Sequence, residues 1–143
     1  MAIRIIVADD HALLRETLSD FLQGQEDMEV IGQAADGKGV MDLTARLQPD
    51  VVVMDVSMPP ALSGLEATRW IHDTWPGVRV VALSMYATRR YVTEMLKAGA
   101  RGYLLKDGDY EELLTAVRAV AAGRTYVGVG VETGQAPAQQ EHG

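Results

Sequence analysis

The chain has 143 residues, no cysteine and a formal net charge of −7, which suits one domain with a single core. The lack of cysteine excludes a disulfide framework and a thiolate metal site. The acidic balance without a basic cluster predicts that this chain alone binds no nucleic acid, and the lack of a signal peptide or a long apolar run predicts a cytoplasmic protein without membrane contact.

Short β-rich runs alternate with longer segments of helical period along most of the chain. Strands are expected at residues 3–8, 28–33, 50–54, 79–83 and 101–105. After each strand, apolar residues recur at intervals of three or four, which predicts five helices. These helices are expected to end near Gly24, Pro49, Pro76, Gly99 and Gly123, since glycine and proline commonly stop a helix.

Five β–α units with short connections predict an α/β protein with a doubly wound parallel sheet. We expect the flavodoxin-like (βα)5 arrangement with strand order 2-1-3-4-5. In such a sheet, ligands bind at the carboxyl ends of the strands. The residues that end strands one, three, four and five are Asp9 with Asp10, Asp55, Ser84 and Lys106.

Three carboxylates that meet at one edge of a sheet repel each other unless a cation lies among them. Mg²⁺ prefers carboxylate and water ligands, and it also polarises phosphoryl oxygens. Lys106 and Ser84 add an ammonium group and a hydroxyl that can contact such oxygens. The set therefore indicates phosphoryl transfer onto a carboxylate, with Asp55 as the acceptor.

Taken singly, each of these residues also has a structural explanation as a helix cap or a turn: for Asp9 and Asp10 a helix cap is as good an explanation as a functional role, and for Asp55 a turn is the commoner one. We favour the functional interpretation because four strand ends of one sheet carry the set. His11, next to the acids, is expected to be a solvent-facing residue at the start of a helix rather than a metal ligand. Residues 37–39 (Gly-Lys-Gly) match no phosphate-binding loop and are expected to form a turn.

Five segments carry a more specific pattern. They are residues 7–11 (Val-Ala-Asp-Asp-His), 53–59 (Val-Met-Asp-Val-Ser-Met-Pro), 64–69 (Gly-Leu-Glu-Ala-Thr-Arg), 81–84 (Val-Ala-Leu-Ser) and 97–106 (Lys-Ala-Gly-Ala-Arg-Gly-Tyr-Leu-Leu-Lys). In this order, the segments resemble the receiver domain of two-component response regulators. The third and fifth segments are similar to the NarL/FixJ (LuxR-type) subfamily, whose members are mostly transcription regulators.

The resemblance implies that Asp55 accepts a phosphoryl group from the phosphohistidine of a sensor histidine kinase. It also implies a bound Mg²⁺. The ion would be ligated by Asp10, Asp55 and the backbone carbonyl of Ser57, and Asp9 would act through water. Such a domain catalyses its own phosphorylation and dephosphorylation, but it is not an enzyme that turns over a metabolite.

The same resemblance implies a switch. Lys106 would bridge the acids before phosphorylation and hold the phosphoryl group afterwards. The Ser84 hydroxyl would move to that group, and the Tyr103 ring would turn inward behind it. The surface of the fourth helix, fifth strand and fifth helix would then change, and homodimerisation would follow.

The resemblance predicts a receiver domain over residues 1–125. Residues 126–143 are rich in glycine, glutamine and alanine and show no periodic pattern, which predicts a disordered tail or a truncated linker. Relatives usually continue into a helix-turn-helix domain, through which they bind DNA, and nothing after Arg124 could form one. A fragment of a longer transcription regulator is favoured over a natural stand-alone receiver. The loop from Pro59 to Gly64 is one residue longer than is usual in the family.

Two rival functions stay open. An aspartate-nucleophile phosphatase would need a second acid two residues after Asp55, but that position holds Ser57. A receiver-like interaction module that is never phosphorylated typically lacks one of the acids or the lysine, whereas this chain has all of them.

Overall fold

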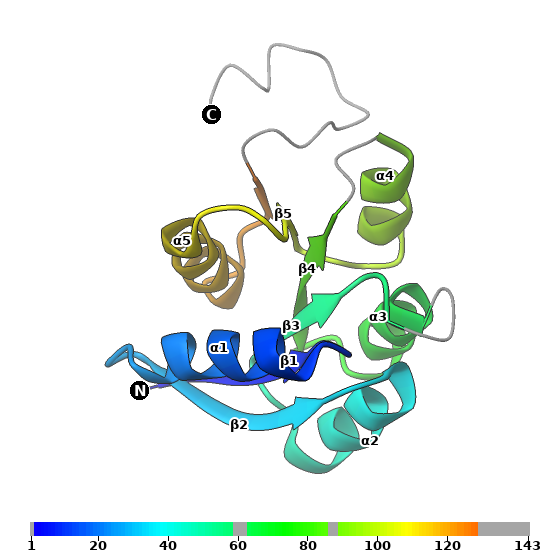
Figure 1. Cartoon of the computed structure of the whole chain (residues 1–143). Helices are drawn as coiled ribbons and strands as arrows, with labels where there is room; N and C mark the ends of the chain where they lie inside the picture. Colours follow the sequence, from blue (N-terminus) through cyan, green and yellow to red (C-terminus); the bar gives the residue numbers. More distant parts are fainter. Residues whose placement is uncertain (1, 59–62, 86–88, 129–143) are drawn as a thin grey trace.

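The computed structural model describes residues 2–58, 63–85 and 89–128, in which helices and strands alternate (Figure 1). The elements are β1 (Ile3–Ala8), α1 (Ala12–Gln23), β2 (Met28–Ala34), α2 (Gly37–Leu47), β3 (Val51–Asp55), α3 (Ser63–Thr74), β4 (Arg79–Ser84), α4 (Arg89–Lys97), β5 (Gly102–Leu105), α5 (Tyr110–Ala121) and β6 (Tyr126–Val127).

The strands form one parallel sheet of order β2-β1-β3-β4-β5-β6. The predicted α/β class and the order 2-1-3-4-5 of the first five strands are confirmed. Among the described residues, no helix is long and apolar enough to cross a membrane.

The sixth strand corrects the prediction that a disordered tail begins at residue 126. The backbone N–H of Tyr126 donates to the Arg101 carbonyl at 2.9 Å, and that of Gly128 donates to the Tyr103 carbonyl at 2.8 Å. Two residues are too few to show an alternating pattern, and this strand forms because the edge of β5 offers it backbone partners. The remainder of the predicted tail, residues 129–143, lies outside the described residues, as do residues 59–62 of the long loop.

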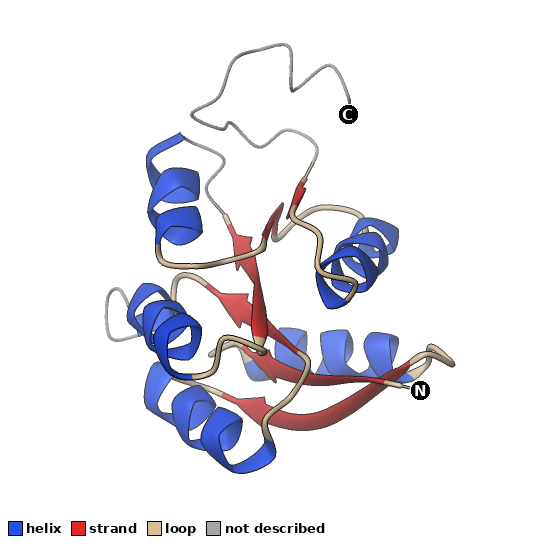
Figure 2. Cartoon of the chain, turned by 180° about the vertical axis from the view of Figure 1, so that it is seen from behind, coloured by secondary structure: helices blue, strands red, loops and turns tan. Residues whose placement is uncertain are grey.

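The sheet lies between two layers of helices (Figures 1 and 2). Helices α1 and α5 cover one face, and α2, α3 and α4 cover the other. Alternate residues of β3 show why both faces are buried: Val51 and Val53 pack with α1 and α5, whereas Val52 and Met54 pack with α2 and α3. This explains the unbroken apolar run in the sequence of this strand.

The segment predicted as a Gly-Lys-Gly turn is instead the first turn of α2. Asp36 caps this helix, and its Oδ1 accepts a hydrogen bond from the N–H of Gly39 at 2.7 Å. Aspartate is a preferred N-cap residue because its carboxylate satisfies an otherwise unpaired N–H. The glycines therefore belong to a helix start, not to a phosphate-binding loop.

A close approach at Gly64 fixes α3 near the end of β3. A Cβ at this position would lie 2.6 Å from the carbonyl oxygen of Asp55 and 2.9 Å from that of Val56. Only glycine allows the first turn of α3 to pack so tightly against the backbone that follows β3.

Candidate functional site

The parallel register brings the predicted strand ends to one edge of the sheet. Asp55 ends β3 and pairs with Leu83, and Ser84 ends β4 and pairs with Leu105. Asp9 follows β1 directly, and Lys106 follows β5. Asp9, Asp55 and Ser84 are all buried, which is unusual for polar residues that serve only as turns.

Lys106 connects two of these strand ends electrostatically. Its Nζ lies 3.2 Å from Asp9 Oδ2 and 3.2 Å from Asp55 Oδ2, and its side chain is 8% exposed. Although burial lowers the pKa of Lys106, the charges of Asp55 and Asp9 raise it more, so the pKa lies above its usual value. The lysine is therefore a charged group that offsets the repulsion between two buried carboxylates.

Asp55 is held in an environment that disfavours its charge. Burial raises the pKa of Asp55, the nearby charge of Asp9 raises it further, and the hydrogen bond from Ser57 and the charge of Lys106 oppose the shift. The N–H of Ser57 donates to Asp55 Oδ1 at 3.0 Å. One carboxylate oxygen is thus fixed by the backbone, while the other faces the lysine.

The loop between β1 and α1 is held by a residue that the sequence analysis missed. Arg15, in the first turns of α1, donates from Nη1 to the Asp9 carbonyl at 2.9 Å and from Nε to Gln33 Oε1 at 3.1 Å. Asp9 Oδ1 in turn accepts the N–H of His11 at 2.9 Å. A single sequence gives no signal for Arg15, because an arginine on a helix surface is ordinary.

His11 is the N-cap residue of α1, and its side chain is 73% exposed, so its predicted place at the start of a helix is confirmed. Its ring, however, is turned toward the acids: Nδ1 lies 3.5 Å from Asp9 Oδ1 and 3.6 Å from Asp10 Oδ1. Asp10 is 31% exposed, at the mouth of the site.

The donor set fits a hard divalent cation. Oxygen atoms of Asp9, Asp10 and Asp55, with a ring nitrogen of His11, all lie within 4.8 Å of one another. Asp9 Oδ2 and Asp55 Oδ2 are buried, and each is paired with the Lys106 ammonium at 3.2 Å. Such carboxylate oxygens are the ligands that Mg²⁺ prefers.

Ser84 and Tyr103 lie together behind these groups. Both side chains are fully buried, and they share a hydrogen bond. The Tyr103 ring therefore already lies inward without a phosphoryl group, whereas the ring was expected to turn inward only after phosphorylation. Burial raises the pKa of Tyr103, and this hydrogen bond partly opposes the shift. The Tyr103 ring packs in the cluster that α4 forms on the sheet, with Val92 and Met95.

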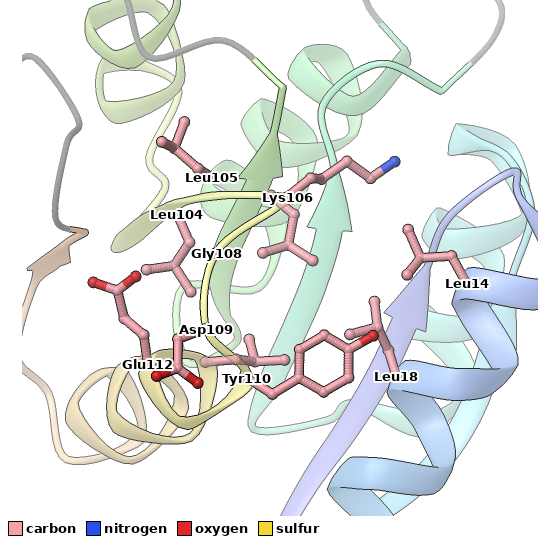
Figure 3. A pocket seen from close by; sticks show the side chains of 11 residues that line it. Leu14, Leu18, Leu104, Leu105, Lys106, Gly108, Asp109, Tyr110 and Glu112 are labelled. Carbon is pink, nitrogen blue, oxygen red and sulfur yellow. The ribbon is translucent and has the colours of Figure 1, made fainter.

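A small pocket lies beside the acidic site, between α1 and the start of α5 (Figure 3). Its wall is largely apolar, with Leu14 and Leu18 from α1 and Leu104 and Leu113 from β5 and α5. The Lys106 ammonium extends away from this pocket, across the ends of the neighbouring strands (Figure 3). The reactive groups therefore lie at the strand ends and not inside the pocket.

The sequence and the geometry agree with one known family. The model of the response regulator receiver domain matches residues 5–118. The chain belongs to the response regulator receiver family. Receiver domains are signalling domains rather than metabolic enzymes. In general, sensor histidine kinases phosphorylate them, and they bind Mg²⁺ in an acidic pocket.

Two curated relatives are oxygen regulatory proteins named NreC. That of Staphylococcus epidermidis is 44% identical over 130 residues, and that of Staphylococcus haemolyticus is 45% identical over 130 residues. Each alignment covers 91% of this receiver and 60% of the relative, so this chain spans about three fifths of the length of the curated relatives it matches.

Solved structures place the receiver in the NarL/LuxR group. A LuxR-family response regulator from Aurantimonas sp. SI85-9A1 superposes with a TM-score of 0.83 at 32% identity, covering 88% of this chain and 89% of that one. The signal receiver domain of NarL from Mycobacterium tuberculosis gives a TM-score of 0.81 at 32% identity, covering 86% and 98%.

Proposed function

We propose that this receiver domain accepts a phosphoryl group on Asp55 from the phosphohistidine of a sensor histidine kinase. The observation that carries the proposal is the position of Asp55: its buried carboxylate ends a central strand, and one of its oxygens lies 3.2 Å from the Lys106 ammonium. The acceptor role is general to the receiver family, and the assignment to Asp55 rests on this geometry.

Each of these residues has a separate role in the phosphoryl transfer. A carboxylate oxygen of Asp55 attacks phosphorus, a P–O bond forms as the P–N bond to the kinase imidazole breaks, and the imidazole leaves with the electron pair. The N–H of Ser57 keeps the carboxylate oriented by holding Oδ1. Lys106 then turns from the acids to a phosphoryl oxygen, and its positive charge stabilises the transferred group.

Asp10, Asp55 and the backbone carbonyl of Ser57 would hold Mg²⁺, and Asp9 would contribute through water. When bound, the ion neutralises charge on the carboxylates and polarises the phosphoryl oxygens. The chain's own residues keep Asp9 and Asp55 close: Arg15 fixes the loop that carries the first acid, and Lys106 lies between the two carboxylates.

Phosphorylation would act on the rest of the domain through Ser84 and Tyr103. A new dianion at Asp55 draws the Ser84 hydroxyl, which breaks its hydrogen bond with Tyr103 and leaves the inward position of the ring to packing alone. The surface made by α4, β5 and α5 changes as a result. In the described chain β6 forms the edge beside β5, so a homodimer through this surface would also involve Tyr126 and Val127.

We propose that the receiver controls transcription in the cytoplasm through a helix-turn-helix domain that would follow residue 143, while the receiver itself binds no DNA. The NarL/LuxR relationship and the relatives' greater length support this proposal. The receiver would also catalyse the hydrolysis of its own aspartyl phosphate, which would reset the switch.

Incubation with acetyl phosphate separates this function from its two rivals. The receiver with Mg²⁺ is expected to gain one phosphoryl group, seen as a mobility shift on a phosphate-affinity gel, and Asp55→Asn or EDTA is expected to abolish the shift. Sustained release of phosphate from many esters would support the phosphatase instead. No labelling by acetyl phosphate or by any histidine kinase would support the unphosphorylated interaction module.

Sedimentation with beryllofluoride tests the dimer separately. The mimic is expected to increase the sedimentation coefficient of the wild type and to leave Asp55→Asn unchanged. Equal sedimentation of the wild type with and without the mimic would contradict dimerisation.

A further inference from the structure

The β6 clasp, residues 126–128, fastens the last described part of the chain to the edge of the sheet. The N–H of Tyr126 donates to the Arg101 carbonyl at 2.9 Å, and the N–H of Gly128 donates to the Tyr103 carbonyl at 2.8 Å. Gly128 is buried, and a Cβ there would lie 2.9 Å from a leucine side chain of β5. The clasp is therefore in direct contact with both the backbone and the side chains of β5.

The side chains of the clasp lie on both faces of the sheet, as successive residues of a strand do. Tyr126 packs against the core on the α5 side, and its hydroxyl donates to Glu112 Oε2 at 3.1 Å. Val127 packs on the opposite side, in the cluster that contains the Tyr103 ring and Val92 of α4. The clasp thus contacts α5, β5 and the α4 cluster at the same time.

The clasp is a small element at the end of an exposed connection. Strand β6 has two residues, whereas the other strands of the described chain have four to seven. Residues 122–125, which lead to it from α5, are exposed, and Gly123 ends the helix with a φ of +90°. Short elements with few buried contacts open locally before the rest of a fold. The clasp is therefore expected to detach while the sheet stays intact.

Tyr103 connects the clasp to the phosphorylation site. Its carbonyl accepts the Gly128 N–H, its ring shares a cluster with Val127, and its hydroxyl shares a hydrogen bond with Ser84. Ser84 ends β4, which pairs with the strand that Asp55 ends. Direct contacts therefore run from the end of β4, beside the acidic site, to the clasp.

Phosphorylation of Asp55 is expected to weaken this attachment. When the Ser84 hydroxyl turns to the phosphoryl group, the buried Tyr103 hydroxyl loses the bond that the two residues share. The loss of a hydrogen bond by a buried polar group is unfavourable, so a movement of Tyr103 toward water or another partner is favoured. Because Val127 and Gly128 contact Tyr103, the same movement disturbs the clasp.

We propose that the β6 clasp is an intramolecular latch, docked on β5 while Asp55 is unmodified and released when Asp55 carries a phosphoryl group. The inference rests on the proposed phosphoryl transfer and goes beyond it, because it assigns a regulatory role to the segment that leaves the receiver. Coupling between two sites is reciprocal, so the docked clasp and the phosphoryl group weaken each other by the same factor.

Hydrogen exchange of individual amides, followed by NMR, measures release of the clasp. In the wild type with Mg²⁺, the phosphate mimic beryllofluoride is expected to accelerate exchange of the Tyr126 and Gly128 amides about 5- to 150-fold, the usual range for coupled sites. Amides of β3, in the centre of the sheet, are expected to keep their rates. Asp55→Asn is expected to show no acceleration, because it lacks the carboxylate that holds the mimic.

The affinity for beryllofluoride is the reciprocal measurement. Gly128→Pro removes the N–H that donates to Tyr103, and Tyr126→Ala removes the packing on α5 and the bond to Glu112. Each variant is expected to bind the mimic at least about fivefold more tightly than the wild type, because the docked clasp no longer opposes binding.

Phe21→Ala is the matched control. Phe21 is another partly buried aromatic residue that packs against the same core as Tyr126, but it lies on α1 and not on the clasp. This variant is expected to bind beryllofluoride within about twofold of the wild type, because substitutions at distant sites act independently.

The proposal is overturned if beryllofluoride binds the wild type and leaves exchange of the Tyr126 and Gly128 amides unchanged. It is also overturned if Gly128→Pro and Tyr126→Ala bind the mimic no more tightly than the wild type, or if the control variant gains as much as they do. Failure of the wild type to bind beryllofluoride at all would contradict the proposed acceptor function, and the latch with it. Binding without release would contradict the latch alone.

Discussion

The Nζ atom of Lys106 lies 3.2 Å from Oδ2 of Asp55, and it lies equally far from Oδ2 of Asp9. The lysine follows β5, whereas the two acids end β3 and follow β1, so the contact joins three strands of the sheet. Because both acids are buried and the lysine side chain is only 8% exposed, the charges interact strongly, and the removal of one leaves the others uncompensated.

Replacement of the lysine tests this balance. Lys106→Met keeps most of the side-chain volume but leaves Asp9 and Asp55 without their ammonium, so the metal-free variant is expected to lose about 2 to 3 kcal/mol of unfolding free energy. Because the folded-state pKa of Lys106 lies above the unfolded value of 10.5, this contribution is present at neutral pH and is lost as pH rises through the folded value. Urea denaturation measures it.

Lys38→Met provides the control, since Lys38 is exposed in the first turn of α2. This variant is expected to change the unfolding free energy by less than about 0.5 kcal/mol. Equal stabilities of the two variants would contradict a compensating role for Lys106.

The raised pKa of Asp55 predicts that its ionised carboxylate lowers the stability of the folded receiver. The folded-state pKa of Asp55 lies above the unfolded value of 3.8. The contribution of this carboxyl group to the unfolding free energy is therefore fully present below the unfolded pKa, and it is lost as pH rises through the folded-state pKa. Without metal at pH 7.5, Asp55→Asn is therefore expected to be about 1 kcal/mol more stable than the wild type. The advantage should vanish as pH falls toward the unfolded pKa, and Mg²⁺ should reduce it by binding only to the wild type.

Denaturation curves with EDTA at several pH values measure this difference. If Asp55→Asn were less stable than the wild type at pH 7.5, or if its advantage grew in acid, the sign of the pKa shift would be wrong.

Gly64 tests the packing that positions the loop after β3. In Gly64→Ala the new Cβ would collide with the carbonyl oxygens of Asp55 and Val56, and backbone atoms cannot rotate away as a side chain can. We expect a loss of about 1 to 3 kcal/mol in unfolding free energy and weaker Mg²⁺ binding. Gly77→Ala is the matched control, because no atom lies within 4 Å of its added Cβ. Similar losses in both variants would contradict the close approach.

Arg15 is expected to position the first acidic loop. Arg15→Ala removes the donor to the Asp9 carbonyl and the contact with Gln33, so Mg²⁺ affinity is expected to fall about tenfold with little change in stability. Gln33→Ala removes one of the two contacts and keeps the bond to Asp9, so it should change Mg²⁺ affinity much less. Isothermal titration calorimetry measures the Mg²⁺ affinity of both variants. Equal losses of affinity would mean that the contact with Gln33, and not the bond to the Asp9 carbonyl, is responsible.

The sequence allowed most of the fold to be predicted, because its strongest signals are periodic. Helix α1 was expected to end near Gly24 and ends at Gln23, and the apolar run beginning at Val51 forms a strand buried on both faces. The strand ends gave the candidate site for the same reason: parallel strands place their carboxyl ends together. Asp9, Asp55 and Lys106 lie together as expected, with the lysine Nζ 3.2 Å from one oxygen of each carboxylate.

Features that depend on contacts between distant segments escaped prediction. The strand of Tyr126 and Val127 exists because the β5 edge is available, and nothing in its two residues indicates a strand. The Gly-Lys-Gly sequence at residues 37–39 favours a turn, because glycine is a poor helix former, but the cap at Asp36 outweighs this preference and the helix begins at Gly37. The orientation of the His11 ring toward Asp9 is likewise a matter of three-dimensional placement.

Borohydride trapping is the most direct test of the central claim that Asp55 carries the phosphoryl group. An aspartyl phosphate is reduced to homoserine, so the receiver is incubated with acetyl phosphate and Mg²⁺, reduced, digested and sequenced by mass spectrometry. The account predicts homoserine at residue 55, dependent on Mg²⁺ and strongly diminished in Lys106→Met. Homoserine at residue 9 or 10, or phosphorylation on a hydroxyl side chain with Asp55 unmodified, would contradict it.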